Sequence, residues 1–206
     1  MYNKIAGQSL ERICALSDGI FAVAMTLIVL EIRLPHVEIH SEAELWAAFI
    51  GLTPQFLTYF LSFLTLGIFW TAQQTQLNFM SRADRDLAWI HFAFLATIAV
   101  LPLSTTILAE HISLRLALVF YWLNILLLGA LLYASWTHAL KQNLIKPETS
   151  EALSSAVKRR IMAAQALYAV AMLVGLWNTY LGIGFIALLQ LNYAIAPRLG
   201  WVYRSL

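Results

Sequence analysis

Six long apolar blocks, separated by short polar stretches, divide the chain. They cover residues 10–34, 45–73, 87–109, 114–138, 161–177 and 180–197. A helix needs roughly 20 apolar residues to cross a bilayer, so the pattern predicts an all-α integral membrane protein with six transmembrane helices in one domain, 1–206. Pro54 and Pro102 fall inside predicted spans, where neighbouring helices can satisfy the freed backbone groups. Ser150 is the predicted N-cap of a short helical stretch, 151–160, that leads into the fifth span.

The first block combines a polar entrance with a regular apolar pattern. Arg12, Ser17 and Asp18 occupy its first turns, and bulky apolar residues then recur every three or four positions, at Ile20, Val23, Leu27, Leu30 and Leu34. At about 100° per residue, Val23, Leu27 and Leu30 share one face, and Asp18 lies about 140° from Val23. That face either lines a pore or packs inside the bundle, since apolar faces suit both places in a membrane helix.

Arg12, Ser17 and Asp18 form a polar motif that needs partners, because ionisable groups at membrane depth are expensive to leave unpaired. Trp70 and His91, on the second and third blocks, carry donors that could serve the motif. The motif is either a structural polar cluster or a site that accepts protons or attracts cations. A second functional hypothesis is therefore a proton-coupled small-molecule transporter that uses Asp18 and His91, although no internal repeat typical of transporters is visible.

Composition supports a membrane protein and excludes other classes. Hydrophobic residues make up 61% of the 206 and charged residues only 12%, against about 25% charged in soluble domains. The net charge of +2 gives no reason to expect a nucleic-acid partner. With the N-terminus inside, the inner segments carry 11 of the 13 Lys and Arg residues and the outer segments carry only Arg33 and Arg115. The positive-inside rule then predicts that both ends of the chain are cytoplasmic.

Motifs for catalysis and for a fixed metal are absent from the sequence. There is no glycine-rich phosphate loop, nucleophile elbow or paired zinc motif, so we expect neither an enzyme nor a cofactor. His36, Glu38 and His40 could offer ligands, but a solvated acidic loop with Glu42 and Glu44 is the simpler interpretation. The Thr-Val-Gly-Tyr-Gly segment of carbonyl-lined potassium filters is also missing.

The segment from Arg12 through Ser17-Asp18 to Ile32 resembles the first helix of the transmembrane protein 175 family, which comprises endolysosomal potassium channels and single-repeat prokaryotic relatives. Trp70 and Pro102 also stand at positions that look like family positions. The resemblance implies a potassium-preferring channel in the cell membrane of a prokaryote, built as a homotetramer. Its permeant ligands would be monovalent cations and its surroundings a lipid bilayer.

The resemblance also implies roles for single residues. The pore would be lined by the first helix, with its narrowest layer at Val23 and further layers at Leu27 and Leu30. Ile20, Thr26 and Leu34 would lie next to these layers. Two departures stand out, since the family usually has Phe before Ser-Asp and Ile at the constriction, and this chain has Leu16 and Val23. Valine lacks one methylene, so the expected ring is slightly wider.

Overall fold

The computed structural model describes residues 9–34 and 39–195. Over these ranges the chain folds into seven α-helices and no named strand. They are α1 (Leu10–Val29), α2 (Glu42–Gly51), α3 (Thr53–Asn78), α4 (Arg85–Glu110), α5 (Arg115–Lys141), α6 (Glu151–Trp177) and α7 (Thr179–Ile195). Five of them, α1 and α3 to α6, are long and apolar enough to cross a membrane, and α7 is apolar but shorter. The predicted all-α membrane fold is confirmed.

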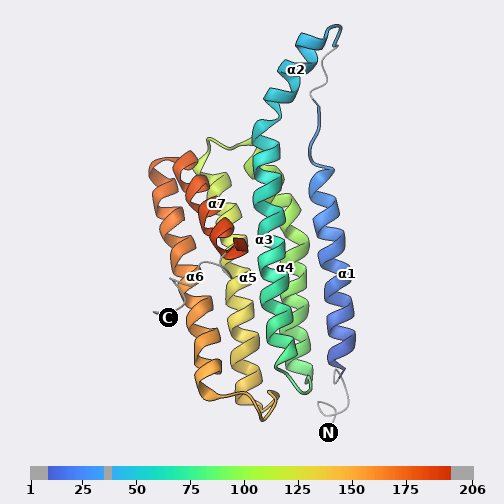
Figure 1. The fold of residues 1–206 in the computed structure, drawn as a ribbon, viewed down its shortest axis with the longest axis vertical. Helices are drawn as coiled ribbons and strands as arrows, with labels where there is room; N and C mark the ends of the chain where they lie inside the picture. The colour runs from blue at the N-terminus through green and yellow to red at the C-terminus, as the bar shows by residue number, and fades with distance from the viewer. Residues whose placement is uncertain (1–8, 35–38, 196–206) are drawn as a thin grey trace.

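The single helix predicted over 45–73 is instead two helices. α2 ends at Gly51, and α3 begins at Thr53 with Pro54 in its first turn. Proline is well tolerated there because the first N–H groups of a helix have no intrahelical acceptor. Pro54 therefore lies in the first turn of a membrane-length helix rather than in its interior. α2 buries no residue and projects beyond the other helices, as Figure 1 shows.

The fifth span is longer than its apolar block. Ser150 caps α6, accepting a hydrogen bond from Leu153 N–H at 3.2 Å, as predicted. Residues 151–160 then continue without a break into the apolar part, so the stretch is one 27-residue helix rather than a separate cytoplasmic turn. The sixth predicted span corresponds to α7, which the structure describes up to Ile195; Ala196 and Pro197 lie outside the described residues.

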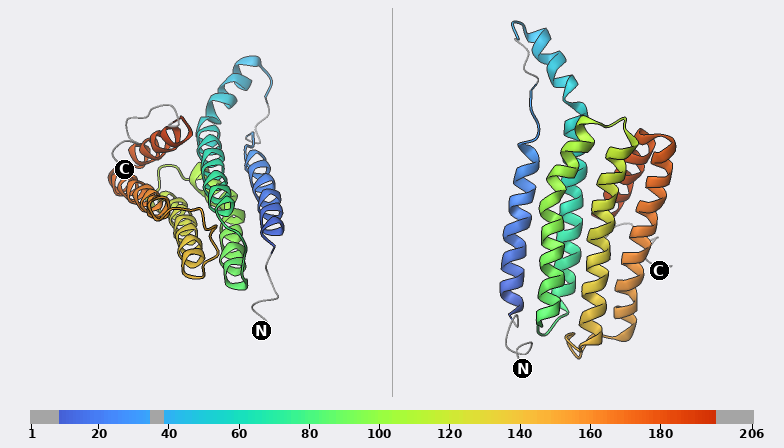
Figure 2. Two further views of the ribbon diagram at one scale, coloured as in Figure 1. Left: turned by 60° about the horizontal axis from the view of Figure 1, so that its bottom comes forward. Right: turned by 180° about the vertical axis from the view of Figure 1, so that it is seen from behind.

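The helices pack side by side in a bundle, in which the last helix, α7, returns to pack against α3. α1 contacts α3 and α4, α4 contacts α5, α5 contacts α6, and α7 packs on α6 and returns to α3. Figure 2 shows α1 at one edge of the bundle and α6 at the opposite edge. A continuous core runs between them and includes Phe21, Leu66, Phe94, Tyr121 and Ile186. α1 thus lies at the edge of the bundle, and much of its circumference is exposed in the described part of the chain.

The loops after α3 and α5 join at one end of the bundle. Met80 and Ile145 form an antiparallel bridge, with Ser81 N–H donating to Leu144 O at 2.8 Å. Nearby, Asp84 caps α4 through Leu87 N–H, and its Oδ2 hydrogen-bonds His138 Nε2 at 2.9 Å. We call this the basic end, because it holds eight of the ten described Lys and Arg residues: Arg12, Arg82, Arg85, Lys141, Lys146, Lys158, Arg159 and Arg160.

Candidate pore-lining helix

The two faces of α1 have different environments. Ser17, Phe21, Ala24 and Ile28 are buried against the helices beside α1. The predicted pore face is uncovered, since Val23 is 56%, Leu27 43% and Leu30 64% exposed, whereas Ile28 is 1% exposed. The apolar stripe of Val23, Leu27 and Leu30 is therefore left largely uncovered by the described part of the chain. Its surroundings are lipid or other copies of the protein.

The residues expected next to the stripe are less uniform. Thr26 is exposed, and its hydroxyl donates to the backbone oxygens of Ala22 and Val23 at 3.1 and 2.8 Å. Leu34 is 48% exposed, beyond the end of α1. Ile20 differs, because it is half-buried and packs against the core, so it lies at the border between the two faces.

Asp18 is attached to α3 rather than directed along the stripe. Its Oδ1 accepts hydrogen bonds from Trp70 Nε1 at 2.8 Å and from Gln74 Nε2 at 2.9 Å. Trp70 and Gln74 are one turn apart on α3 and so share a face. The carboxylate and its donors are at the surface of the single chain. Asp18 thus fixes the position of α1 on α3.

Ser17 belongs to a separate, buried cluster of three helices. Its hydroxyl donates to Ile13 O at 2.7 Å and accepts from Gln73 Nε2 at 2.7 Å. His91 on α4 hydrogen-bonds Ser17 Oγ at 3.0 Å and also Gln73. The hydrogen bonds of His91 therefore go to Ser17 and Gln73 rather than to Asp18. Ser17 and Asp18 are consecutive residues, so their side chains point about 100° apart on α1. They therefore belong to two different clusters.

Arg12 takes no part in either cluster's hydrogen bonds. It lies in the first turn of α1 and is exposed, and its backbone N–H donates to Ser9 Oγ at 3.4 Å, the N-cap of the helix. Of the three loop residues considered as metal ligands, His36 and Glu38 lie outside the described residues. Within the described ranges, no three His, Cys, Asp or Glu side chains are placed to share a metal ion.

A third polar cluster lies among α3, α4, α5 and α7 and was not anticipated from the sequence. Tyr121 OH hydrogen-bonds Thr65 Oγ1 at 2.9 Å, and Gln190 Nε2 donates to the same threonine at 2.6 Å. Thr105 Oγ1 donates to Ser62 Oγ at 2.6 Å. These residues come from α3, α4, α5 and α7, and all are almost fully buried. Ser62 and Thr65, three positions apart on one face of α3, are a sequence signal that could have indicated it.

Known proteins with similar sequences include potassium channels. Residues 12–102 match the family described as the endosomal/lysosomal potassium channel TMEM175. A potassium channel of Streptomyces collinus is 31% identical over 131 residues, which are 62% of this chain and 63% of that protein. A potassium channel of Chamaesiphon minutus is 27% identical over 188 residues, 89% of this chain and 93% of that protein.

The similarity in fold covers more of the chain than the family match does. The crystal structure of a lysosomal potassium-selective channel TMEM175 homolog from Chamaesiphon minutus superposes with a TM-score of 0.80 at 25% identity, covering 92% of this chain and 98% of that one. The chain is similar to the transmembrane protein 175 channels in sequence and in fold. The human endosomal/lysosomal proton channel TMEM175 is 34% identical over 102 residues, but this chain spans only 20% of its length.

The family match covers the part of the chain that carries the candidate site. Residues 12–102 include the stripe on α1, all of α3 and the His91 turn of α4. Trp70 was anticipated as a partner of the polar motif, whereas Gln73 and Gln74 were not. A polar pair placed three and four residues after Trp70 on an apolar helix is the signal that could have identified them.

Proposed function

We propose that this protein is a potassium-preferring cation channel in which four copies surround an axis lined by α1. Val23, Leu27 and Leu30 form the hydrophobic constriction, with Ile20, Thr26 and Leu34 beside it. One observation carries the proposal: the stripe is exposed in the described part of the chain, whereas Asp18 and Ser17, on other sides of α1, are held by α3 and α4. The potassium-channel names of the bacterial relatives support it.

The stripe would select ions through their hydration. An ion that crosses an apolar ring sheds part of its water and gains little from the side chains in return. Sodium holds its water more tightly than potassium, so the barrier is higher for sodium. No cofactor is needed for this chemistry. The permeant cation itself is the only ligand of the proposed site.

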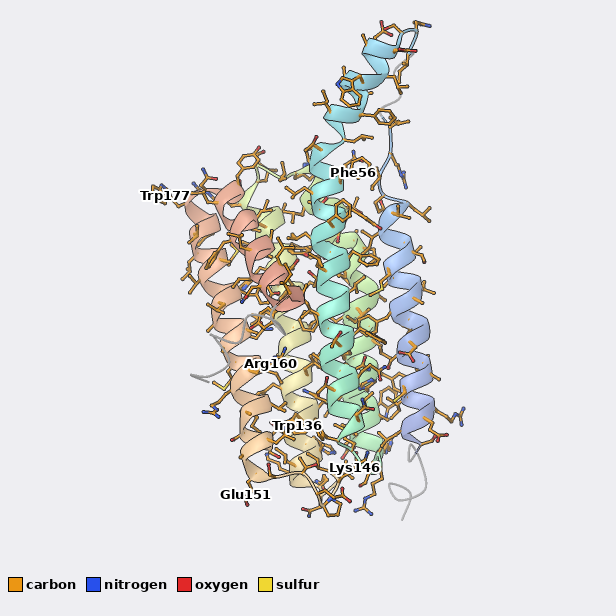
Figure 3. All side chains as sticks on the ribbon, in the orientation of Figure 1. Phe56, Trp136, Lys146, Glu151, Arg160 and Trp177 are labelled. Carbon is orange, nitrogen blue, oxygen red and sulfur yellow. The ribbon has the colours of Figure 1, made fainter. Side chains whose placement is uncertain are left out.

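The distribution of charge supports an orientation for the proposed channel. Arg33 and Arg115 lie at the opposite end of the bundle from the eight cations of the basic end. Lys146 and Glu151 are at one end in Figure 3, and Phe56 and Trp177 are at the other. The positive-inside rule puts the basic end in the cytoplasm, with six crossings and both ends of the chain inside a prokaryotic cell membrane.

The competing hypothesis, a proton-coupled transporter, requires Asp18 and His91 to act together. In the structure their hydrogen bonds belong to different clusters, one at the surface of the chain and one buried. The observations therefore favour a passive channel.

The test measures ion flux from liposomes that contain the purified protein, without an imposed proton gradient. Potassium efflux and its ratio to sodium efflux are compared for the wild type, Val23→Asn and Val29→Asn. Val29 is the matched control because it is also exposed on α1 (46%) but lies about 120° from Val23. Ile28 is a poor control for a polar substitution because it is buried.

The expected result is passive potassium efflux in the wild type and a selective gain of sodium flux in Val23→Asn. The amide would replace part of the hydration that sodium loses at the ring. Val29→Asn should keep the wild-type ratio. A flux that requires a proton gradient would favour the transporter, and a ratio that changes only with Val29 would show that the wrong face of α1 has been assigned to the pore.

A further inference from the structure

Arg12 is the member of the polar motif that neither the Asp18 cluster nor the Ser17 cluster uses. Its side chain is exposed, and among the described residues none forms a hydrogen bond or an ion pair with its guanidinium. Residues 1–8 contain Lys4 but no Asp or Glu. A positive charge in the first turn of a helix is also unfavourable for the helix itself, because the helix dipole is positive there. Neither an ion pair nor helix stability therefore accounts for Arg12.

The end of α1 that carries Arg12 packs on the bundle through its opposite face. Leu10, Ile13 and Cys14 pack against a buried cluster that includes Leu87. At about 100° per residue, Arg12 lies about 150° from the middle of that packing face. The guanidinium therefore belongs to the free side of α1 and points away from the rest of the chain.

The free side that carries Arg12 is also the side of the apolar stripe. Arg12 is 11 residues before Val23, which at about 100° per residue places the two within about 20° of each other around α1. Leu16 lies between them on the same side and is 42% exposed. Gly19 is exposed too, and a Cβ added there meets nothing within 4 Å. The exposed face therefore continues without interruption from the stripe to the basic end.

We propose that Arg12 lines the inner mouth of the pore and makes potassium flow into the cell more easily than out of it. The inference rests on the proposed channel, in which four copies turn this face of α1 towards one axis. Four guanidiniums would then surround the path at a level about 16 Å from Val23, since a helix rises about 1.5 Å per residue. The positive-inside rule puts this level on the cytoplasmic side.

A ring of positive charge acts on cations before they reach the constriction. Rings of Asp or Glu suit cation pores, and rings of Arg or Lys suit anion pores, because the field of the protein sets the local concentration of ions. Potassium that arrives from the cytoplasm is depleted at the inner mouth, whereas potassium from outside crosses the constriction first. Potassium and sodium carry the same charge, so the ring affects the direction of flow and leaves the preference between the two ions to the stripe.

The test records single-channel currents of the purified full-length protein with the same KCl concentration on both sides. At low salt the wild type should carry more inward than outward current, and Arg12→Gln should raise the outward current about two- to fivefold. At about 1 M KCl, where the Debye length is about 3 Å, the two should converge. Arg159→Gln should behave as the wild type, because Arg159 is an exposed cation of the basic end on α6, at the opposite edge of the bundle.

Charged thiol reagents test the position of residue 12 in a second way. In a Cys14→Ser background, Arg12→Cys is treated from the side of the basic end with methanethiosulfonates that attach either a trimethylammonium or a sulfonate group. The cationic group should lower the outward current towards the wild-type value, and the anionic group should raise it further. Glu11→Cys in the same background is the matched control, because Glu11 is also exposed but points about 100° away from Arg12. Its two modified forms should conduct alike.

The possible negative results separate this inference from the channel function. No potassium current in the wild type would overturn both. A potassium current whose outward part responds neither to Arg12→Gln nor to the two reagents would overturn the inference alone, and would mean that the guanidinium faces lipid. A response of Glu11→Cys as large as that of Arg12→Cys, or a changed ratio of potassium to sodium in Arg12→Gln, would also overturn it.

Discussion

At the scale of single residues, Asp18 allows a structural role and a role in ion preference to be tested separately. Asp18→Ala leaves Trp70 Nε1 and Gln74 Nε2 without their shared acceptor, and an unpaired group of this kind costs about 1–3 kcal/mol when it is shielded from water. We expect a lower yield of assembled protein and a lower melting temperature, measured by size-exclusion chromatography and thermal unfolding. Asp18→Asn, which keeps an acceptor oxygen, should be milder.

The same variants also report on ion preference. Asp18 contacts α3 rather than following the stripe, so the channels that do assemble as Asp18→Ala should keep the wild-type ratio of potassium to sodium flux. Normal assembly together with a changed ratio would contradict the structural role and would mean that the carboxylate faces the ions.

How much of this detail the sequence could predict depends on how many helices each contact involves. The angle between Asp18 and Val23 follows from helix geometry alone, and so does the expectation that they point apart. The partners of Ser17 do not follow from the geometry of one helix. Its contacts with Gln73 and His91 depend on how α1, α3 and α4 are rotated about their own axes. Hydropathy carries no information about those rotations.

At the scale of elements, the contact between α6 and α7 depends on two glycines. A Cβ built on Gly182 would be 2.5 Å from Gly175 Cα and 2.9 Å from Gly175 N, and neither backbone atom can move cheaply. Gly182→Ala should therefore destabilise the protein by about 1–3 kcal/mol. Gly184→Ala, where the Cβ meets open space, should be neutral or stabilising by up to about 1 kcal/mol, because alanine favours the helix.

Thermal unfolding of the two alanine variants in the same detergent measures this difference. Opposite shifts in the melting temperature would support the close approach of α6 and α7. Equal shifts would show that the helices are farther apart than the structure places them.

Element boundaries were harder to predict than element type. The long apolar blocks correctly indicated helices, yet 45–73 contains the break at Leu52 between α2 and α3. Hydropathy could not locate it, because α2 is as apolar as a span although it buries no residue. The charged stretch 151–160 was predicted apart from its span because hydropathy detects only the apolar part of a helix. In the structure, α6 begins after its N-cap Ser150 and continues through these polar residues.

At the scale of the whole molecule, the exposed surface indicates how copies assemble. Beyond the stripe on α1, α2 exposes Trp46 (67%), Phe49 (46%) and Ile50 (60%), and in Figure 2 it continues α3 past the body of the bundle. A single chain cannot enclose a water path with one helix. Closed rings are the usual symmetry of assemblies built from one kind of chain, so the unpacked face of α1 is the surface expected to meet the axis.

Four copies around that axis would bring four equivalent positions of each stripe residue together, and a thiol at Val23 tests this. In a Cys14→Ser background, which removes the one native cysteine, Val23→Cys would place four thiols at the constriction, the ligand set that zinc prefers. Micromolar Zn²⁺ should block potassium flux through this variant, a chelator should restore it, and native mass spectrometry should give four times the 23.2 kDa chain mass. Val29→Cys in the same background should conduct with or without Zn²⁺, because its thiols point away from the axis. A monomeric mass, or a block that depends on Val29 and not on Val23, would show that α1 does not line the path with this face.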